Sequence, residues 1–234
     1  TQTWRMNTTA VNGEPIDISF GPSDITSPAG AETTQYARAD SGGFTNRFSL
    51  AGQPPAGLTR EYVRGFRLFT RPSTTSAFSD YWCVFGVPTR LEDRLPTSTI
   101  TYTSFSIRGT AVVSNGPQAG QYDLSDSTVP LSANPANGQV PAQVTLVGRQ
   151  FTPSGLSTTQ TDLGTFSGTA TVDGQSQNFN AGFDQSNRAL AGPHGFGGWF
   201  FGPQGIEAGC GFSIQFNQPT GEAVLATGAV TARR

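Results

Sequence analysis

The sequence has 234 residues, of which 16 are acidic and 14 basic, and its formal net charge is −2. This balance leaves no excess of positive charge to bind a nucleic acid or an anionic membrane face. No apolar run approaches the roughly 18 residues that a membrane helix needs. With 29 Gly, 16 Pro and only 13% charged residues, the composition favours short strands and tight turns over helices.

The first segment predicts a hairpin over residues 3–20. Ile16, Ile18 and Phe20 alternate with polar residues, and Asn12-Gly13 precedes them. Asn-Gly between alternating runs is a strong hairpin signal, because both turn residues must tolerate positive φ.

The rest of the N-terminal part predicts fewer strands. Residues 21–57 are rich in Gly, Pro, Ser and Ala, so we expect mostly irregular loop there, with one strand around residues 44–50. Alternation over residues 60–70 predicts another strand. The sequence changes character after a polar connector, residues 72–79, so we expect an N-terminal β-rich subdomain over residues 1–78 and a second domain over 79–234.

The second domain predicts short strands at regular spacing, which is typical of an all-β sandwich or barrel. Asp173-Gly174 predicts a two-residue hairpin, and glycines inside strands, such as Gly198 and Gly209, favour a strongly coiled sheet that closes on itself. We therefore expect an antiparallel β-barrel of about eight strands. The predicted strands cover residues 81–87, 99–113, 122–129, 143–149, 163–172, 175–183, 190–201, 207–216 and 223–231.

A family resemblance rests on the stretch that begins Gly197-Gly-Trp-Phe-Phe-Gly-Pro. It is similar to the signature of the transferrin-binding protein B-like β-barrels, a family of bacterial surface lipoproteins and solute-binding proteins with related barrels in factor H-binding protein and secreted haem carriers. The resemblance covers residues 81–234. The matching positions are Phe200, Phe201, Gly202, Pro203, Glu207, Gly209 and Phe212.

The resemblance implies that residues 1–78 form a handle-like subdomain and that the signature residues are mainly structural. Cys210 stands where the family usually has Gly, and Cys83 lies at the start of the barrel. An even pair of cysteines in an exported protein is more often a disulfide than two free thiols, so we expect a Cys83–Cys210 bridge. The alternative is a pair of free core thiols.

The search for catalytic chemistry yields little. The chain has a single histidine, His194, and lacks the common zinc, phosphate-loop and nucleophile-elbow motifs. We therefore predict no enzyme, no catalytic residue and no metal site. His194, on a loop beside Phe196, is a candidate haem ligand, because some proteins with this barrel carry haem; the alternative is an ordinary exposed loop histidine.

Arginines and aromatic residues share the strand predicted over residues 60–70. Arg60, Arg64, Arg67 and Arg71 recur beside aromatic residues such as Tyr62, a pattern that suits recognition of carboxylates or of a protein surface. The alternative is an edge strand that its charges protect against self-pairing.

Three functions remain open. The resemblance implies a cell-envelope binding protein that captures an iron- or haem-bearing ligand or protein partner and passes it to an outer-membrane receptor. The second is a haem carrier with His194 or a tyrosine as ligand, and the third is a structural or assembly protein of the cell surface. Because the chain begins at Thr1 rather than Met, we expect an exported protein without its leader, either anchored at the outer membrane surface or secreted.

Overall fold

The computed structural model describes residues 3–9, 15–29, 31, 33–51, 60–71, 79–93, 95–173 and 177–234. The chain divides into two compact units. The N-terminal unit comprises Thr1–Pro54 and Phe66–Tyr81, and the barrel unit comprises Pro55–Gly65 and Trp82–Arg234. Both consist of strands, so the predicted all-β class is confirmed.

The N-terminal unit opens with the predicted hairpin. Strand β1 (Trp4–Thr9) pairs antiparallel with β2 (Pro15–Phe20), from Trp4 opposite Phe20 to Thr9 opposite Pro15. The Asn12-Gly13 turn lies outside the described residues. A single 3-10 turn, η1 (Pro22–Asp24), follows β2.

A four-stranded sheet follows in the order β3-β4-β5-β6. Its strands are β3 (Thr33–Ala39), β4 (Thr45–Ala51), β5 (Val63–Thr70) and β6 (Ser79–Gly86). Strand β3 corrects the expectation of irregular loop, and its buried Tyr36 explains the strand because it packs on Phe20 and Phe48. Aromatic contact of this kind stabilises a strand whose own alternation is weak.

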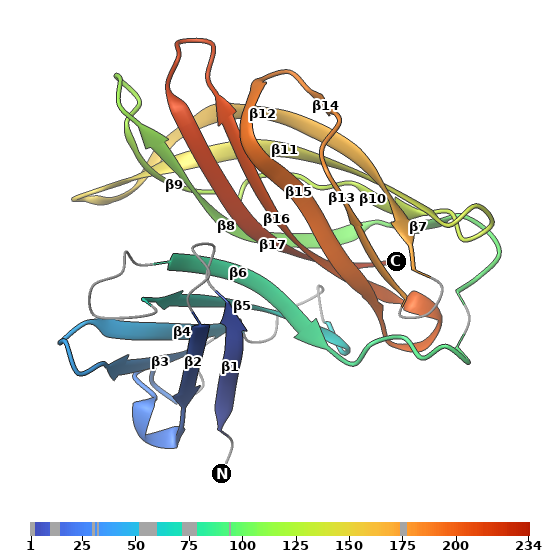
Figure 1. The fold of residues 1–234 in the computed structure, drawn as a ribbon, viewed down its shortest axis with the longest axis horizontal. Coiled ribbons are helices and arrows are strands. Elements are labelled where there is room, and N and C mark those ends of the chain that lie inside the picture. Colours follow the sequence, from blue (N-terminus) through green and yellow to red (C-terminus); the bar gives the residue numbers. More distant parts are fainter. Residues whose placement is uncertain are drawn as a thin grey trace. The chain divides into compact units, whose positions relative to one another are not determined.

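The barrel unit contains a closed ring of eight antiparallel strands (Figure 1). Strand β17 pairs with β8 along eleven residues, from Ala223 opposite Ser114 to Arg233 opposite Ser104, and this pairing closes the ring. In ring order the strands are β8 (Ser104–Ser114), β9 (Gly120–Asp123), β11 (Gln139–Thr152), β12 (Gly155–Val172), β13 (Asn178–Ala181), β15 (Ala189–Phe201), β16 (Glu207–Asn217) and β17 (Ala223–Arg233).

Short elements complete the barrel unit. Strands β7 (Ile100–Tyr102), β10 (Leu131–Ala133) and β14 (Gln185–Ser186) extend the sheet, and the 3-10 turn η2 (Pro203–Gly205) joins β15 to β16. No helix in the described part of the chain has the length and apolar character to cross a membrane.

Buried aromatic and aliphatic side chains fill the interior of the ring. Phe166 packs against Phe183 and Phe216, and Phe179 packs against Phe196 and Phe200, with ring centroids 4.8–6.4 Å apart. Side chains are expected to fill a barrel of eight strands.

Two connections differ from the prediction. The strand expected over residues 122–129 ends at Asp123, whose carboxylate accepts the Ser125 N–H at 2.9 Å and so turns the chain. After β12, Val172 pairs with Phe179, so the connection is longer than the two residues predicted at Asp173-Gly174. Gly174 itself lies outside the described residues.

Candidate functional site

The Phe200–Pro203 turn is held from several sides. Gly202 has φ 70°, and a Cβ on it would lie 2.5 Å from the Tyr62 ring, so only glycine fits this position. The hydroxyl of Thr89 donates to the Gly202 carbonyl at 2.7 Å. Phe200 is fully buried in the barrel core. The turn therefore has a packing role.

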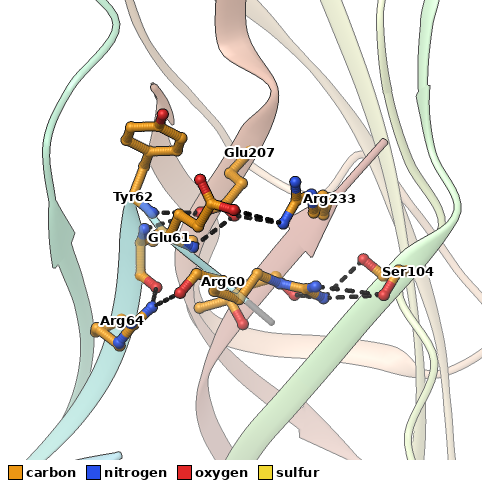
Figure 2. Close-up of polar contacts among 9 residues, drawn as sticks. Arg60, Glu61, Tyr62, Arg64, Ser104, Glu207 and Arg233 are labelled. Carbon is orange, nitrogen blue, oxygen red and sulfur yellow. Dashed lines mark hydrogen bonds and ion pairs between the residues drawn. The ribbon is translucent and has the colours of Figure 1, made fainter. Parts of the chain in front are cut away.

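Glu207 forms the centre of a buried polar cluster (Figure 2). Its side chain is fully buried, and its carboxylate accepts the backbone N–H groups of Glu61, Tyr62 and Val63 at 2.8–2.9 Å. The Arg233 guanidinium lies 3.8 Å from the same carboxylate. Several N–H donors compensate a buried carboxylate for the loss of water, so Glu207 anchors residues 61–63 to the barrel.

Arg60 anchors the same segment from its other end (Figure 2). The side chain is 1% exposed and donates to the Ser104 carbonyl at 2.8 Å and to the Thr231 carbonyl at 3.4 Å. Burial lowers the pKa of Arg60, and the nearby Glu207 carboxylate opposes that shift. Arg60 is thus directed into the barrel unit.

Tyr62 completes the anchor through its backbone. Its carbonyl accepts the Val87 N–H at 2.9 Å, and a Cβ at Gly86 would lie 1.9 Å from that same oxygen. Glu207, Arg60 and Tyr62 thus fix the start of β5 beside the end of β6. The two charged side chains at the centre of the anchor, Glu207 and Arg60, are buried and bind backbone groups.

The remaining predicted arginines have partners of their own. Arg64 donates to the carbonyls of Arg60 and Val63. Arg67 forms a two-point ion pair with Asp80, with both hydrogen bonds at 2.8 Å. The structure brings Arg60, Tyr62 and Arg64 together in the barrel unit, whereas Arg67 belongs to the N-terminal unit.

His194 lies within strand β15 rather than on a loop. Its Nδ1 accepts the Phe183 N–H at 3.2 Å, which places the proton of the neutral ring on Nε2 and leaves no free lone pair there for iron. Phe196 is 5% exposed, and its ring packs on Phe179 and Phe183 inside the barrel. These two residues do not fit a haem site.

An open hollow of about 600 Å³ borders His194, with Trp82, Asn180 and Ser213 among its lining residues. The buried Tyr102 does not fit the role of an alternative ligand. Tyr102 donates its hydroxyl to the Gly205 carbonyl at 2.8 Å, and burial raises its pKa, so it stays a neutral phenol. Within the described ranges, no group of three or more His, Cys, Asp or Glu could hold a metal ion.

The predicted disulfide is wrong, because Cys83 and Cys210 are both free thiols. Cys210 belongs to the core inside the ring. Its neighbours Gly209 and Gly211 face β6 instead, since a Cβ on Gly209 would lie 3.2 Å from Val84 and one on Gly211 would lie 3.4 Å from the Trp82 carbonyl. Successive side chains point to opposite faces of a strand, so Cys210 points away from the strand that carries Cys83.

The sequence could not reveal the partners of Glu207. The family signature marks Glu207 itself, but its donors are backbone groups about 145 positions earlier in the chain. Any residue type except proline supplies a backbone N–H, so a sequence carries no signal for this contact.

Comparison with known proteins supports the fold. No family model and no curated protein matches the sequence. A solved structure of transferrin-binding protein B from Haemophilus parasuis Hp5, a vaccine antigen in double-mutant form, has 13% identity and a TM-score of 0.52 over 99% of this chain and 44% of its own. The isotype 1 transferrin-binding protein B from serogroup B Neisseria meningitidis has 14% identity and a TM-score of 0.48 over 94% of this chain and 38% of its own.

The present chain thus spans less than half the length of either protein. At this level of identity the likeness concerns the fold alone. The predicted resemblance is confirmed at that level: the chain has a transferrin-binding protein B-like β-barrel fold.

Proposed function

We propose that this chain is a non-enzymatic binding protein of the bacterial cell envelope. It captures an iron- or haem-bearing ligand or protein partner at the outer membrane surface, or as a secreted protein, and passes it to an outer-membrane receptor. The observation that carries the proposal is the fold likeness to transferrin-binding protein B over 99% of the chain.

The buried anchor is consistent with a binding scaffold. The side chains of Glu207 and Arg60 form hydrogen bonds to backbone groups of the barrel unit, and side chains fill the interior of the ring. A rigid core of this kind leaves contacts with a partner to exposed loops and to the N-terminal unit.

A growth experiment tests the proposal. A deletion strain of the source organism is grown with iron supplied as ferric citrate, as haem or as an iron-loaded carrier protein. We expect normal growth on ferric citrate and impaired growth on at least one of the other two sources, with rescue by the wild-type gene. Equal growth on all three sources would contradict an uptake role.

A pull-down identifies the partner. The tagged chain is incubated with envelope extract and with culture fluid from iron-limited cells, and mass spectrometry compares the captured proteins with those captured by the empty matrix. We expect an outer-membrane importer or an iron- or haem-bearing protein. Size-exclusion chromatography addresses the alternative, because a chain that runs as a polymer favours a structural role at the cell surface.

A further inference from the structure

A polar cleft of about 640 Å³ lies within the N-terminal unit. The β1–β2 hairpin contributes Arg5 and Asp17. Strand β3 contributes Arg38, and Asp40 and Arg71 directly follow β3 and β5. Its charged lining is thus made of arginine and aspartate side chains. Of the arginines that the sequence predicted to meet a partner, Arg71 lines this cleft, whereas Arg60, Arg64 and Arg67 do not.

Two ion pairs satisfy four of these five charges. Arg5 holds Asp17 through two hydrogen bonds of 2.9 and 2.6 Å, and Arg71 holds Asp40 through bonds of 2.8 and 3.0 Å. Hydrogen bonding from Arg71 lowers the pKa of Asp40 to about 2, and hydrogen bonding from Arg5 lowers that of Asp17. Both aspartates therefore stay ionised at neutral pH and remain committed to their own arginines.

Arg38 is the fifth charge. Its Nη1 donates to the Ser19 carbonyl at 2.8 Å, which ties the exposed side chain to the hairpin. Within the described part of the chain, no carboxylate forms an ion pair with Arg38. A guanidinium has five N–H donors in a planar fork, so donors remain that match the two oxygens of a carboxylate.

We infer that this cleft binds a carboxylate of the partner, with Arg38 as its main contact. Three arginines face two aspartates, so one positive charge is uncompensated at the cleft. The contact of Arg38 with Ser19 orients the guanidinium before a ligand arrives, which reduces the ordering cost of binding. This inference rests on the proposed function and deepens it, because it specifies that the partner binds through an acidic segment.

The chain offers a matched control. Arg47 lies on β4, is exposed and does not line the cleft, so Arg47→Gln makes the same charge change elsewhere in the same unit. Fluorescence anisotropy of a labelled hexaglutamate peptide measures binding to the full chain, with hexaglutamine as the neutral peptide. Circular dichroism first checks that both variants are folded.

We expect hexaglutamate to bind the wild type, and hexaglutamine to bind at least tenfold more weakly. Arg38→Gln should weaken hexaglutamate binding at least tenfold, whereas Arg47→Gln should change it less than twofold. Equal losses in the two variants, or no binding to the wild type, would overturn the inference. In the wild type, the Nε–Hε NMR signal of Arg38 should move on addition of peptide, and an unchanged signal would also overturn it.

Two further measurements distinguish the origin of the carboxylate and the level of any failure. Competition by millimolar succinate would mean that a free dicarboxylate suffices, and its absence would mean that a peptide segment is needed; both support the carboxylate site. If the peptide fails to bind but the pull-down captures an importer, the cleft assignment is wrong and the proposed function stands. If the peptide binds but the growth experiment shows no defect, the cleft assignment stands and the proposed function is wrong.

Discussion

At the scale of single residues, the Glu207 carboxylate holds residues 61–63 to the barrel through their backbone N–H groups. Glu207→Gln replaces one acceptor oxygen by an amide nitrogen that faces backbone N–H donors. Bonds to a charged group contribute more than neutral ones, so we expect a loss of about 2–4 kcal/mol in the free energy of unfolding. Urea unfolding followed by tryptophan fluorescence measures it.

Glu61 provides the control for that measurement. It lies on the anchored segment, its side chain is 59% exposed, and its nearest cation is Arg233 at 3.7 Å. Glu61→Gln should change the free energy of unfolding by less than about 0.5 kcal/mol. If the two variants lose equal stability, the buried anchor is not what stabilises the barrel.

The two cysteines give a second prediction. Burial raises the pKa of Cys83 to about 11 and that of Cys210 to about 12, so both remain protonated and unreactive at pH 8. We expect iodoacetamide to leave the folded protein unlabelled and to add two adducts once the protein is denatured without a reductant. Mass spectrometry that finds no adduct under those conditions would mean that a disulfide forms after all.

His194 gives a third prediction. Because its Nδ1 accepts the Phe183 N–H, the ring must rotate or exchange its proton to ligate iron. Haem titrated into the wild type and into His194→Ala should therefore give the same Soret spectrum. A shift in the wild type that is lost in His194→Ala would restore the haem-carrier hypothesis.

At the scale of elements, glycines allow neighbouring strands to approach closely. A Cβ on Gly198 of β15 would lie 2.1 Å from the Gly209 carbonyl oxygen and 2.7 Å from the Cys210 Cβ. We expect Gly198→Ala to cost about 1–3 kcal/mol in the free energy of unfolding, because the backbone of β16 would have to shift. Thermal unfolding by circular dichroism measures this cost.

Gly211 on the neighbouring strand is the control for that substitution. A Cβ there would lie 3.4 Å from the Trp82 carbonyl oxygen, close to ordinary contact. Gly211→Ala should therefore cost clearly less than Gly198→Ala. The opposite order would show that crowding between β15 and β16 does not set the tolerance.

Strong alternation of apolar and polar residues predicted strands well, whereas weak alternation did not. Phe212, Ile214 and Phe216 gave strand β16 within one residue of its observed end. Strand β3 was missed because its sequence, Thr-Thr-Gln-Tyr-Ala-Arg-Ala, carries only one large buried side chain, Tyr36. Tertiary packing on Phe20 and Phe48 decides that strand, and local patterns do not contain it.

The candidate site was less predictable than the fold. A sequence pattern of arginines beside aromatic residues is the same whether the guanidinium binds a partner protein or groups of its own chain. Arg60 meets Ser104, and Arg67 meets Asp80, in contacts that only the folded chain reveals. Arg38 had no distinguishing neighbours in the sequence, and the cleft around it arises from a hairpin and a sheet that local patterns do not bring together.

At the scale of the whole molecule, residues 55–65 belong to the barrel unit, whereas the residues on either side of them in the sequence belong to the N-terminal unit. A Cβ on Gly65 would lie 3.9 Å from the Cys83 carbonyl oxygen, so a short Asn-Gly turn can join residues 55–65 to residues 82–234. We expect this shortened chain to fold as a monomer that unfolds cooperatively.

A chain of residues 82–234 alone is the comparison. It lacks the three donors of Glu207 and the Arg60 side chain, so it should be less stable by about 3 kcal/mol or more, because a buried carboxylate loses its hydrogen bonds. Urea unfolding compares the two. Equal stability would mean that residues 55–65 are dispensable for the barrel.

Closure of the ring by β8 and β17 also sets an order of events during synthesis. Nearly half of the chain separates these two strands, so a nascent chain cannot close the ring until residues 223–233 have left the ribosome. Until then β8 and β16 each present an open edge, which invites pairing with other chains.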